Sequence, residues 1–311
     1  MTADNFDAVV IGGGPAGATT ADDLAQKGWR VLLLDRGGRI KPCGGAIPPR
    51  LIKDFEIPDH LLVARARCAR MISPSDNRVD IPIENGFVGM VNRDAFDEWL
   101  RERAASHGAV RQRGTLSPDF YGWVFPHGDT MSVGTGSADK GFSLRNAVGR
   151  LRETAGLQDA TTLRREGAPI PLKPLPRWDN GRDVMLCGDA AGVVAPSSGE
   201  GIYYAMACGR MTADAAHHFL ETGQVAALKA ARKQFMKEHG KVFWVLGIMQ
   251  YFWYSSDRRR EKFVKICEDK DVQQLTFESY MNKVLVRKKP MAHVRIFFKD
   301  LGHLLGFART S

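Results

Sequence analysis

The sequence predicts an α/β protein with a parallel β-sheet near its N-terminus and a helical C-terminal third. Three observations lead to this fold class: an apolar run that meets a glycine cluster near the N-terminus, a second apolar run that meets Gly188, and helical periodicity with few breakers after residue 223. The chain has 311 residues, of which 44% are apolar and 25% charged. These values exclude a disordered chain, a collagen-like chain and a multi-span membrane protein.

The first 35 residues alternate between buried-strand and helix patterns. Asp7–Ile11 is almost continuously apolar, as a buried parallel strand requires. The glycine-rich stretch Gly12–Gly17 follows, and residues 18–26 have the pattern of a helix. A second strand pattern, residues 30–34, ends at Asp35. This order of strand, G-x-G-x-x-G, helix, strand and acid is typical of a Rossmann-type dinucleotide-binding unit.

Each part of this unit has a chemical reason. Gly12 allows the tight turn, Gly14 lets the backbone approach a pyrophosphate, and Gly17 lets helix and strand pack closely. The helix N-terminus offers free N–H groups to the phosphates. Asp35 accepts hydrogen bonds from an adenosine ribose and repels a 2′-phosphate, so the pattern suits FAD or NAD better than NADP. The alternative is a glycine-rich turn without chemical meaning.

A second nucleotide-contacting element is expected far downstream. Asp183–Cys187 reads as another buried strand, followed by Gly188-Asp189 and, after Gly199-Glu200, by a helix that begins at Gly201–Ile202. Asp189 is placed to bond ribityl hydroxyls, unless it is an ordinary turn residue or helix cap. The helix start can hold negative charge on a reduced flavin. An NAD-only dehydrogenase does not need this element, so the pair indicates an FAD-binding domain of the glutathione-reductase/hydroxylase type.

Several further motifs make the chain resemble the geranylgeranyl reductase family of flavoproteins, in particular the branch of (bacterio)chlorophyll synthesis. The resemblance covers nearly the whole chain. The motifs that carry it are Asp35-Arg36, Lys41–Pro48 with its Cys-Gly-Gly, Phe87–Arg93 with Phe96-Asp97 and Trp99-Leu100, Tyr121–Pro126, Gly188–Gly192 with Gly199–Gly201, and the run from Tyr251 to Lys289.

The resemblance implies an FAD-dependent enzyme that takes electrons from NADPH and saturates isolated double bonds of a geranylgeranyl chain to phytyl. The substrate would be geranylgeranyl diphosphate, geranylgeranyl-(bacterio)chlorophyll, or both. The alternatives are a monooxygenase of the same flavoprotein class and a catalytically impaired flavin- or pigment-binding protein. The flavin contacts that the resemblance implies are Ala16, Asp35, Cys43, Gly44, Ala46, Arg93, Asp189, Gly201 and Ile202.

The sequence departs from this family at one place. After Thr115 the family continues through several strands and a flavin motif before the equivalent of Leu116, and here that stretch is missing. In the family, one of the missing strands belongs to the parallel sheet, and the others form much of the substrate-domain sheet. The departure is what makes an impaired protein an alternative.

Three motifs have both a functional and a structural interpretation. Cys43 could contact the flavin or donate a proton to the reduced alkene, or it could only pack. Tyr121, Trp123 and Phe125 alternate along a strand, so they could line a wall for a polyprenyl chain or face an ordinary core. Arg93 could bond the flavin, or it could form a salt bridge with Asp97 one helical turn on.

The motifs divide the chain into three regions. The FAD-binding domain is expected to be discontinuous, formed by residues 1–63, 93–115 and 178–222. Residues 64–92 and 116–177 form a strand-rich substrate domain, and residues 223–311 a helical region.

The helical region accounts for the net charge of +9. Residues 1–200 carry 25 basic and 25 acidic side chains, and residues 201–311 carry 19 against 10. The apolar, aromatic run Val242–Tyr254 meets Arg258–Arg260 but is too short to span a bilayer. It reads as an interfacial helix on an anionic membrane or as a buried helix that closes the substrate domain.

These features predict a peripheral protein on the cytoplasmic side of a photosynthetic membrane. No nucleic-acid-binding motif accompanies the basic charge, so no nucleic-acid partner is expected. The five cysteines are scattered without a C-x-x-C pair, which predicts neither a disulfide framework nor a metal site. The N-terminus has no secretory signal pattern.

Overall fold

A computed structural model gives the fold of the chain. It describes residues 5–35, 43–83, 86–113, 121–127, 130–135, 145, 148–149, 152–153, 157–163, 170–273, 280–281 and 283.

A three-stranded parallel sheet forms the N-terminal part of the fold. Its strands are β1 (Ala8–Ile11), β2 (Val31–Asp35) and β8 (Val110–Arg113), in the order β1-β2-β8. The helix α1 (Pro15–Gln26) connects β1 to β2, as the glycine motif predicts. Neighbouring strands are in register, so Val9 pairs with Leu32.

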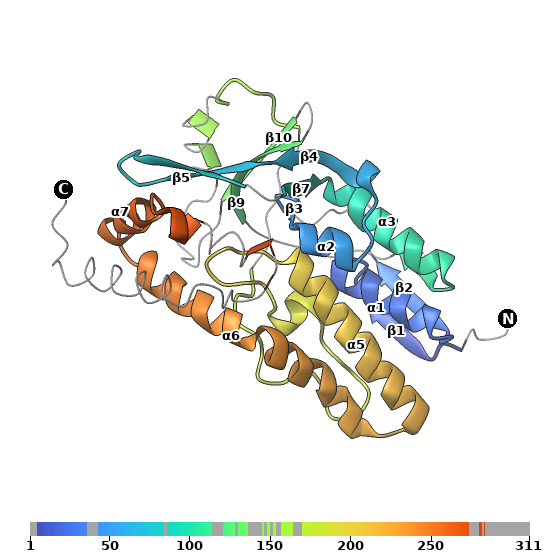
Figure 1. The fold of residues 1–311 in the computed structure, drawn as a ribbon. Helices are drawn as coiled ribbons and strands as arrows, with labels where there is room; N and C mark the ends of the chain where they lie inside the picture. Colours follow the sequence, from blue (N-terminus) through green and yellow to red (C-terminus); the bar gives the residue numbers. More distant parts are fainter. Residues whose placement is uncertain are drawn as a thin grey trace.

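One face of this sheet is packed against three helices. They are α1, α3 (Arg93–Ser106) and α5 (Ile202–Thr222), which lie close to β1 and β2 in Figure 1. Alternate strand residues and small helix residues form the shared core: Ala21, Leu24, Ala25, Val31, Leu33, Ala104, Ala109 and Ala213. The small side chains on the helices allow the helix axes to approach the sheet closely.

The strands outside the parallel sheet pair antiparallel. The sheet β3-β7-β4 consists of Ala46–Ile47, Val88–Val91 and Leu62–Ala66, with α2 (Pro49–Asp54) and the short helix η1 (Asp59–Leu61) between its strands. Two further pairs form separate two-stranded sheets: β5 (Cys68–Ile72) with β6 (Arg78–Pro82), and β9 (Tyr121–His127) with β10 (Thr130–Thr135). These strands fall mainly within the predicted substrate domain, although β3 lies at Ala46–Ile47 and β4 begins at Leu62, both in the predicted FAD-binding domain. The exact domain division stays a prediction.

Helices follow α5 towards the C-terminus, as the periodicity predicts. They are η3 (Val225–Lys229), α6 (Ala230–Trp253) and α7 (Asp257–Ile266). The long α6 runs beside α5 and continues towards α7, which packs against β6 through Val264 and Cys267 (Figure 1). Among the described helices, none has the length and apolar composition needed to cross a membrane.

The strand predicted at residues 183–187 is not formed. Only Met185 makes an isolated bridge, to Asp179, and the side chain of Val184 is 53% exposed. A strand needs a neighbour to satisfy its backbone groups, and no described strand lies in register beside this segment. The short helix η2 (Gly188–Ala191) follows directly.

Candidate active site

The glycine-rich loop between β1 and α1 has the geometry that a pyrophosphate needs. The amide of Gly12, at φ +103°, donates to the carbonyl of Leu34, which ties the loop to β2. A Cβ on Gly17 would lie 1.9 Å from the Gly12 carbonyl oxygen, so only glycine fits there. A Cβ on Gly12 or Gly14 would meet nothing within 4 Å. The backbone is therefore open where a phosphate would approach the N-terminus of α1, and the loop fits FAD.

The second predicted flavin element lies directly against this loop. Gly188, at φ +60°, approaches α1 so closely that an added Cβ would be 2.6 Å from the Cβ of Ala16. Gly209 of α5 approaches from another side, and a Cβ there would be 2.4 Å from the Ala16 carbonyl oxygen. The Thr20 hydroxyl, 3.0 Å from the carbonyl oxygens of both Ala16 and Gly209, donates to them. Two elements about 170 residues apart thus meet at Ala16.

Asp189 follows Gly188 on η2, and Gly201 caps the N-terminus of α5. Ile202 is the first residue of that helix and is buried. The structure thus brings Ala16, Asp189 and the start of α5 to one side of the glycine loop. The contacts of these residues with FAD stay predictions.

Asp35 at the end of β2 is tied to a residue that sequence reasoning missed. Arg101 of α3 donates from Nη1 to Asp35 Oδ2 at 2.8 Å and to the Gly13 carbonyl at 3.0 Å. Both side chains are largely buried, 14% and 23% exposed. Arg101 therefore fixes the carboxylate that is expected to meet the adenosine ribose. Because 66 residues separate the partners, no local pattern could reveal the pair.

The Cys-Gly-Gly loop is joined to α3 through β7. The amide of Val91 donates to the Gly45 carbonyl at 2.9 Å, and Ala46 pairs with Met90. The half-buried Cys43 accepts from the Gly45 amide, with 3.4 Å between nitrogen and Sγ. Gly44 lies between these residues, and its contacts with FAD stay a prediction. The loop is thus held in place by backbone pairing with β7.

Arg93, the first residue of α3, forms the salt bridge that was its structural alternative. Its Nε and Nη2 donate to the two carboxylate oxygens of Asp97 at 2.7 and 2.8 Å, and the two side chains are only 6% and 8% exposed. Burial by itself would lower the pKa of Arg93, but the charge of Asp97 and a hydrogen bond with Cys43 outweigh it, and the pKa is raised. Cys43, Arg93 and Asp97 thus form one buried network. A flavin contact of Arg93 stays a prediction.

A buried ion pair lies just before α5. Glu200 binds Lys283, and their side chains are 7% and 1% exposed. The Lys283 ammonium also lies 3.6 Å from the ring centroid of Tyr280. Tyr280 and Met281 pack against Ala46, Val88 and Met90 in another small core. Tyr280, Met281 and Lys283 therefore link the loop before α5 to the strands that follow the Cys-Gly-Gly motif, a link that sequence reasoning did not find.

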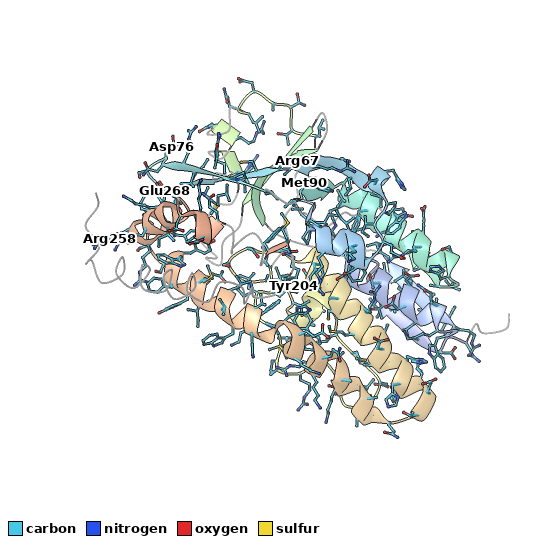
Figure 2. All side chains as sticks on the ribbon, viewed as in Figure 1. Arg67, Asp76, Met90, Tyr204, Arg258 and Glu268 are labelled. Atoms are coloured by element: carbon cyan, nitrogen blue, oxygen red, sulfur yellow. The ribbon has the colours of Figure 1, made fainter. Side chains whose placement is uncertain are left out.

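The first turn of α5 meets α6 in an aromatic cluster around His239. The His239 ring lies 5.0–5.9 Å, centroid to centroid, from the rings of Tyr203, Tyr204 and Phe235. Figure 2 marks Tyr204 at the inner end of α5. Both ring nitrogens of His239 are buried without a hydrogen-bond partner among the described residues. Burial lowers the pKa of His239 to about 4, and burial raises the pKa of Tyr204.

The predicted substrate wall lies on β9, which runs next to β4 and β7. Tyr121, Trp123 and Phe125 occupy this strand, and their side chains lie outside the described residues. The pairing with β10 shifts register between Gly134 and Thr135, opposite Trp123 and Tyr121. The regular alternation assumed from the sequence is therefore unbroken only from Trp123 onwards.

Neither a metal site nor a disulfide is found within the described parts of the chain. No group of three or more histidine, cysteine or acidic side chains there could hold a metal ion. All five cysteines lie in those parts, and none of them is in a disulfide.

Comparison with known proteins identifies the kind of fold and site. A family model described as FAD dependent oxidoreductase matches residues 7–166. The geranylgeranyl diphosphate reductase of Rhodobacter capsulatus is 50% identical over 382 residues, covering 97% of this chain and 98% of its own. The enzyme of the same name from Synechocystis is 32% identical and covers 95% and 97%.

A solved structure agrees with this assignment. The crystal structure of a geranylgeranyl bacteriochlorophyll reductase-like protein from Thermoplasma acidophilum superposes with a TM-score of 0.75 at 18% identity, covering 95% of this chain and 99% of that one. These comparisons confirm the predicted FAD-binding oxidoreductase fold and the family resemblance.

This chain is shorter than its alignment with the Rhodobacter relative. The Rhodobacter alignment runs over 382 residues, whereas this chain has 311, so at least 71 aligned positions, the difference between the two, have no residue here. The difference lies inside the chain, because nearly all of both sequences is covered.

Proposed function

The chain belongs to the geranylgeranyl reductase family of FAD-dependent oxidoreductases, and from this premise we propose that it reduces a geranylgeranyl chain to phytyl. The electrons come from NADPH, and the substrate is geranylgeranyl diphosphate, geranylgeranyl-(bacterio)chlorophyll, or both, in (bacterio)chlorophyll biosynthesis. The observation that carries the proposal is the meeting of the glycine loop with η2 and α5 at Ala16. Together with the near full-length similarity to named reductases, it supports a flavin site of this family.

Bound FAD would supply the hydride that is added to one carbon of the double bond. The open backbone at Gly12 and Gly14 and the N-terminus of α1 would hold its pyrophosphate, and Asp35, fixed by Arg101, would bind the adenosine ribose. Asp189 would bind the ribityl chain. The start of α5 at Gly201–Ile202 would stabilise the negative charge of a reduced flavin.

The residues around the substrate exclude water and deliver the proton. The second alkene carbon needs a proton, and Cys43, held in the network with Arg93, is the group that we assign to this step. The aromatic strand β9 forms one wall of the prenyl site. Tyr280, Met281 and Lys283, anchored by the Glu200–Lys283 pair, close the site from the side of the C-terminal region.

The test measures the mass of the prenyl product after incubation with FAD, NADPH and each substrate. Every double bond that is reduced adds two hydrogens, so the mass counts them directly. Cys43→Ser should keep FAD and slow alkene reduction more than flavin reduction by NADPH. Oxygen consumption coupled to NADPH, with an oxygenated product, would indicate the monooxygenase instead. Bound flavin that NADPH and prenyl substrate leave unchanged would indicate the impaired binding protein.

We also propose that α6 places the protein on the cytoplasmic side of a photosynthetic membrane. Lys237, Lys241, Trp244, Ile248 and Tyr251 are spaced by three or four residues and therefore share one helix face. All are exposed, with Trp244 at 69% and Tyr251 at 82%. Lysines beside an aromatic stripe are typical of a helix that lies in an anionic interface.

The opposite face of α6 belongs to the core. Phe243 and Trp253 are only 5% and 7% exposed, so the buried and the interfacial interpretations each apply to one face of the same helix. Of the arginines after α6, Arg258 and Arg260 are exposed, and Figure 2 marks Arg258 at the outer end of the molecule. Arg259 and Arg260 bind backbone carbonyls at the α6–α7 turn. The membrane contact therefore rests on the α6 stripe rather than on the arginine cluster.

Binding to lipid vesicles tests this placement. Lys237→Glu with Lys241→Glu should weaken binding to anionic vesicles about tenfold or more, because each lysine contributes on the order of 1 kcal/mol near such a surface. Trp244→Gln with Tyr251→Gln should remove the part of the binding that high salt leaves intact. Lys53→Glu, an exposed charge reversal on α2, is the control. Equal binding of all variants, or equal binding to neutral vesicles, contradicts the placement.

A further inference from the structure

Lys283 is a buried cation in a constrained position. Its side chain is 1% exposed, and its ammonium donates to Oε2 of Glu200, whose side chain is 7% exposed. On another side the ammonium lies 3.6 Å from the ring centroid of Tyr280. The backbone of Lys283 has φ +55°, a left-handed conformation that residues other than glycine rarely adopt. Such conformations persist where the surrounding structure imposes them, and they cluster at functional sites.

Stability alone does not account for this ion pair. Burial raises the pKa of Glu200 and lowers the pKa of Lys283, and only their mutual attraction opposes these shifts. Oε1 of Glu200 is buried without a hydrogen-bond partner among the described residues. Replacing a buried ion pair by apolar side chains often leaves a protein equally stable, so the two charges are not needed for packing.

The carboxylate of Glu200 lies at the start of α5. Glu200 directly precedes Gly201, the N-cap of this helix. Its charge reaches the first turn, because burial and then the charge of Glu200 are the main causes that raise the pKa of Tyr204. A helix N-terminus carries a partial positive charge, and an uncompensated carboxylate beside it would cancel that charge. The ammonium of Lys283 supplies the compensation.

Lys283 also reaches the Cys-Gly-Gly loop through its neighbours. Tyr280 and Met281 pack in one small core with Ala46, which follows that loop on β3. The other end of the link is the pair with Glu200. Lys283 therefore connects the two segments that are expected to contact the flavin, one before α5 and one at β3.

Resting on the proposed function, we propose that Lys283 is an electrostatic positioning residue of the flavin site. Its ammonium neutralises Glu200 and thereby leaves the positive end of α5 available to reduced FAD. The hydride that NADPH gives up carries two electrons and one proton, so NADPH becomes NADP⁺ and the flavin gains one negative charge. A group that compensates Glu200 therefore strengthens binding of reduced FAD relative to oxidised FAD, and so raises the reduction potential of the bound flavin.

The test measures this potential in the FAD-loaded protein by equilibration with a redox dye. Lys283→Met leaves the charge of Glu200 uncompensated and should weaken binding of reduced FAD about tenfold relative to oxidised FAD. For a two-electron couple, tenfold is a fall of about 30 mV. Glu200→Gln leaves the ammonium in excess and should raise the potential by a similar amount. The double variant has no net charge at the pair and should return to the parent potential.

A matched control removes a lysine from a different ion pair with α5. Lys27 binds Asp214 at 3.0 Å, and Asp214 lies twelve residues after Ile202, about 18 Å along the helix. Lys27→Met changes the net charge by the same unit as Lys283→Met and should leave the potential unchanged. An equal fall in both variants would show a general charge effect and overturn the proposal.

The pattern of signs separates electrostatics from a structural link. Equal potentials in the parent and all pair variants overturn the proposal, and so does a fall in both single variants, which indicates a disturbed site. If Lys283→Met does not fold, Glu200→Gln and the double variant decide: the first must raise the potential and the second must restore it. The measurement needs no prenyl substrate. A parent that binds FAD but forms no reduced prenyl product therefore contradicts the proposed function, whereas unchanged potentials contradict only the role of Lys283.

Discussion

The buried His239 predicts a loss of stability in mild acid. In the folded state its pKa is about 4, since burial lowers it and the nearby cations Arg50 and Lys283 add to this, while Glu238 acts in the opposite direction. In the unfolded chain the pKa is about 6.5. The unfolded state therefore binds the proton more tightly, so this contribution to stability is complete above pH 6.5 and is lost as the pH falls towards 4.

The size of the effect follows from the two pKa values. Between pH 7 and pH 5 the protonation of His239 should lower the free energy of unfolding by about 2 kcal/mol, with a limit of about 3.4 kcal/mol below pH 4. The charged ring has no acceptor to compensate it: both nitrogens are unpartnered among the described residues, and Glu238 Oε2 is 4.0 Å from Nε2.

Urea unfolding at pH 7 and pH 5 measures this difference. His239→Leu keeps a similar volume in the aromatic cluster and removes the titrating group. The parent should lose about 2 kcal/mol more than this variant between the two pH values. His60→Gln, at an exposed position on η1, is the control and should behave as the parent. If His239→Leu loses as much stability as the parent, His239 is not protonated at the expense of folding, and the reasoning from burial is refuted.

Three further changes test other parts of the site. Gly17→Ala should lower the free energy of unfolding, measured in urea, by about 3 kcal/mol, because its Cβ would lie 1.9 Å from the Gly12 carbonyl oxygen. Gly14→Ala places its Cβ in open space and should weaken FAD binding without a loss of stability. Lys283→Met should lower the free energy of unfolding by about 3–5 kcal/mol, because it leaves Glu200 buried and unpaired. Adding Glu200→Gln should restore most of that stability, and equal losses in the single and double variants would contradict this. Arg101→Gln should raise the Kd for FAD roughly fivefold, as titration by flavin fluorescence would show, and an unchanged Kd would exclude its role in fixing Asp35.

The sequence predicts the local parts of the flavin site well because their signals are local. Gly12 and Gly17 are required by backbone approach within a few residues, and the structure places them as the motif predicts. Asp35 is the last residue of β2, as the motif predicts. The pairing of α1 with η2 through Ala16 and Gly188 is not local, and it was predicted only because both halves carry recognisable motifs.

Partners without a motif could not be predicted. Arg101 is one of many surface-type arginines in sequence, and its role depends on the angle at which α3 crosses the end of β2. Lys283 belongs to a basic region that reads as solvated charge, yet its side chain is 1% exposed. In both cases tertiary packing determines the role of a long side chain, and local propensity contains no information about it.

The strand predicted at residues 183–187 shows how a correct pattern can give a wrong element. The apolar pattern Asp-Val-Met-Leu-Cys describes what a parallel strand would bury, but a strand forms only where a neighbour offers its backbone groups. Among the described strands, none offers those groups beside residues 183–187. The pattern therefore names the residues that a strand would bury, and tertiary context decides whether the strand forms.

The flavin loop itself does not depend on a strand at residues 183–187. The contacts that fix it are made with β2 and on the helix side: Gly12 to Leu34, Thr20 to Gly209, and Gly188 to Ala16. A Cβ on Gly14 would meet nothing within 4 Å, whereas a Cβ on Gly17 would lie 1.9 Å from the Gly12 carbonyl oxygen. FAD binding and resistance to unfolding should therefore respond independently: Gly14→Ala should lower flavin affinity and leave the melting temperature unchanged, and Gly17→Ala should lower the melting temperature.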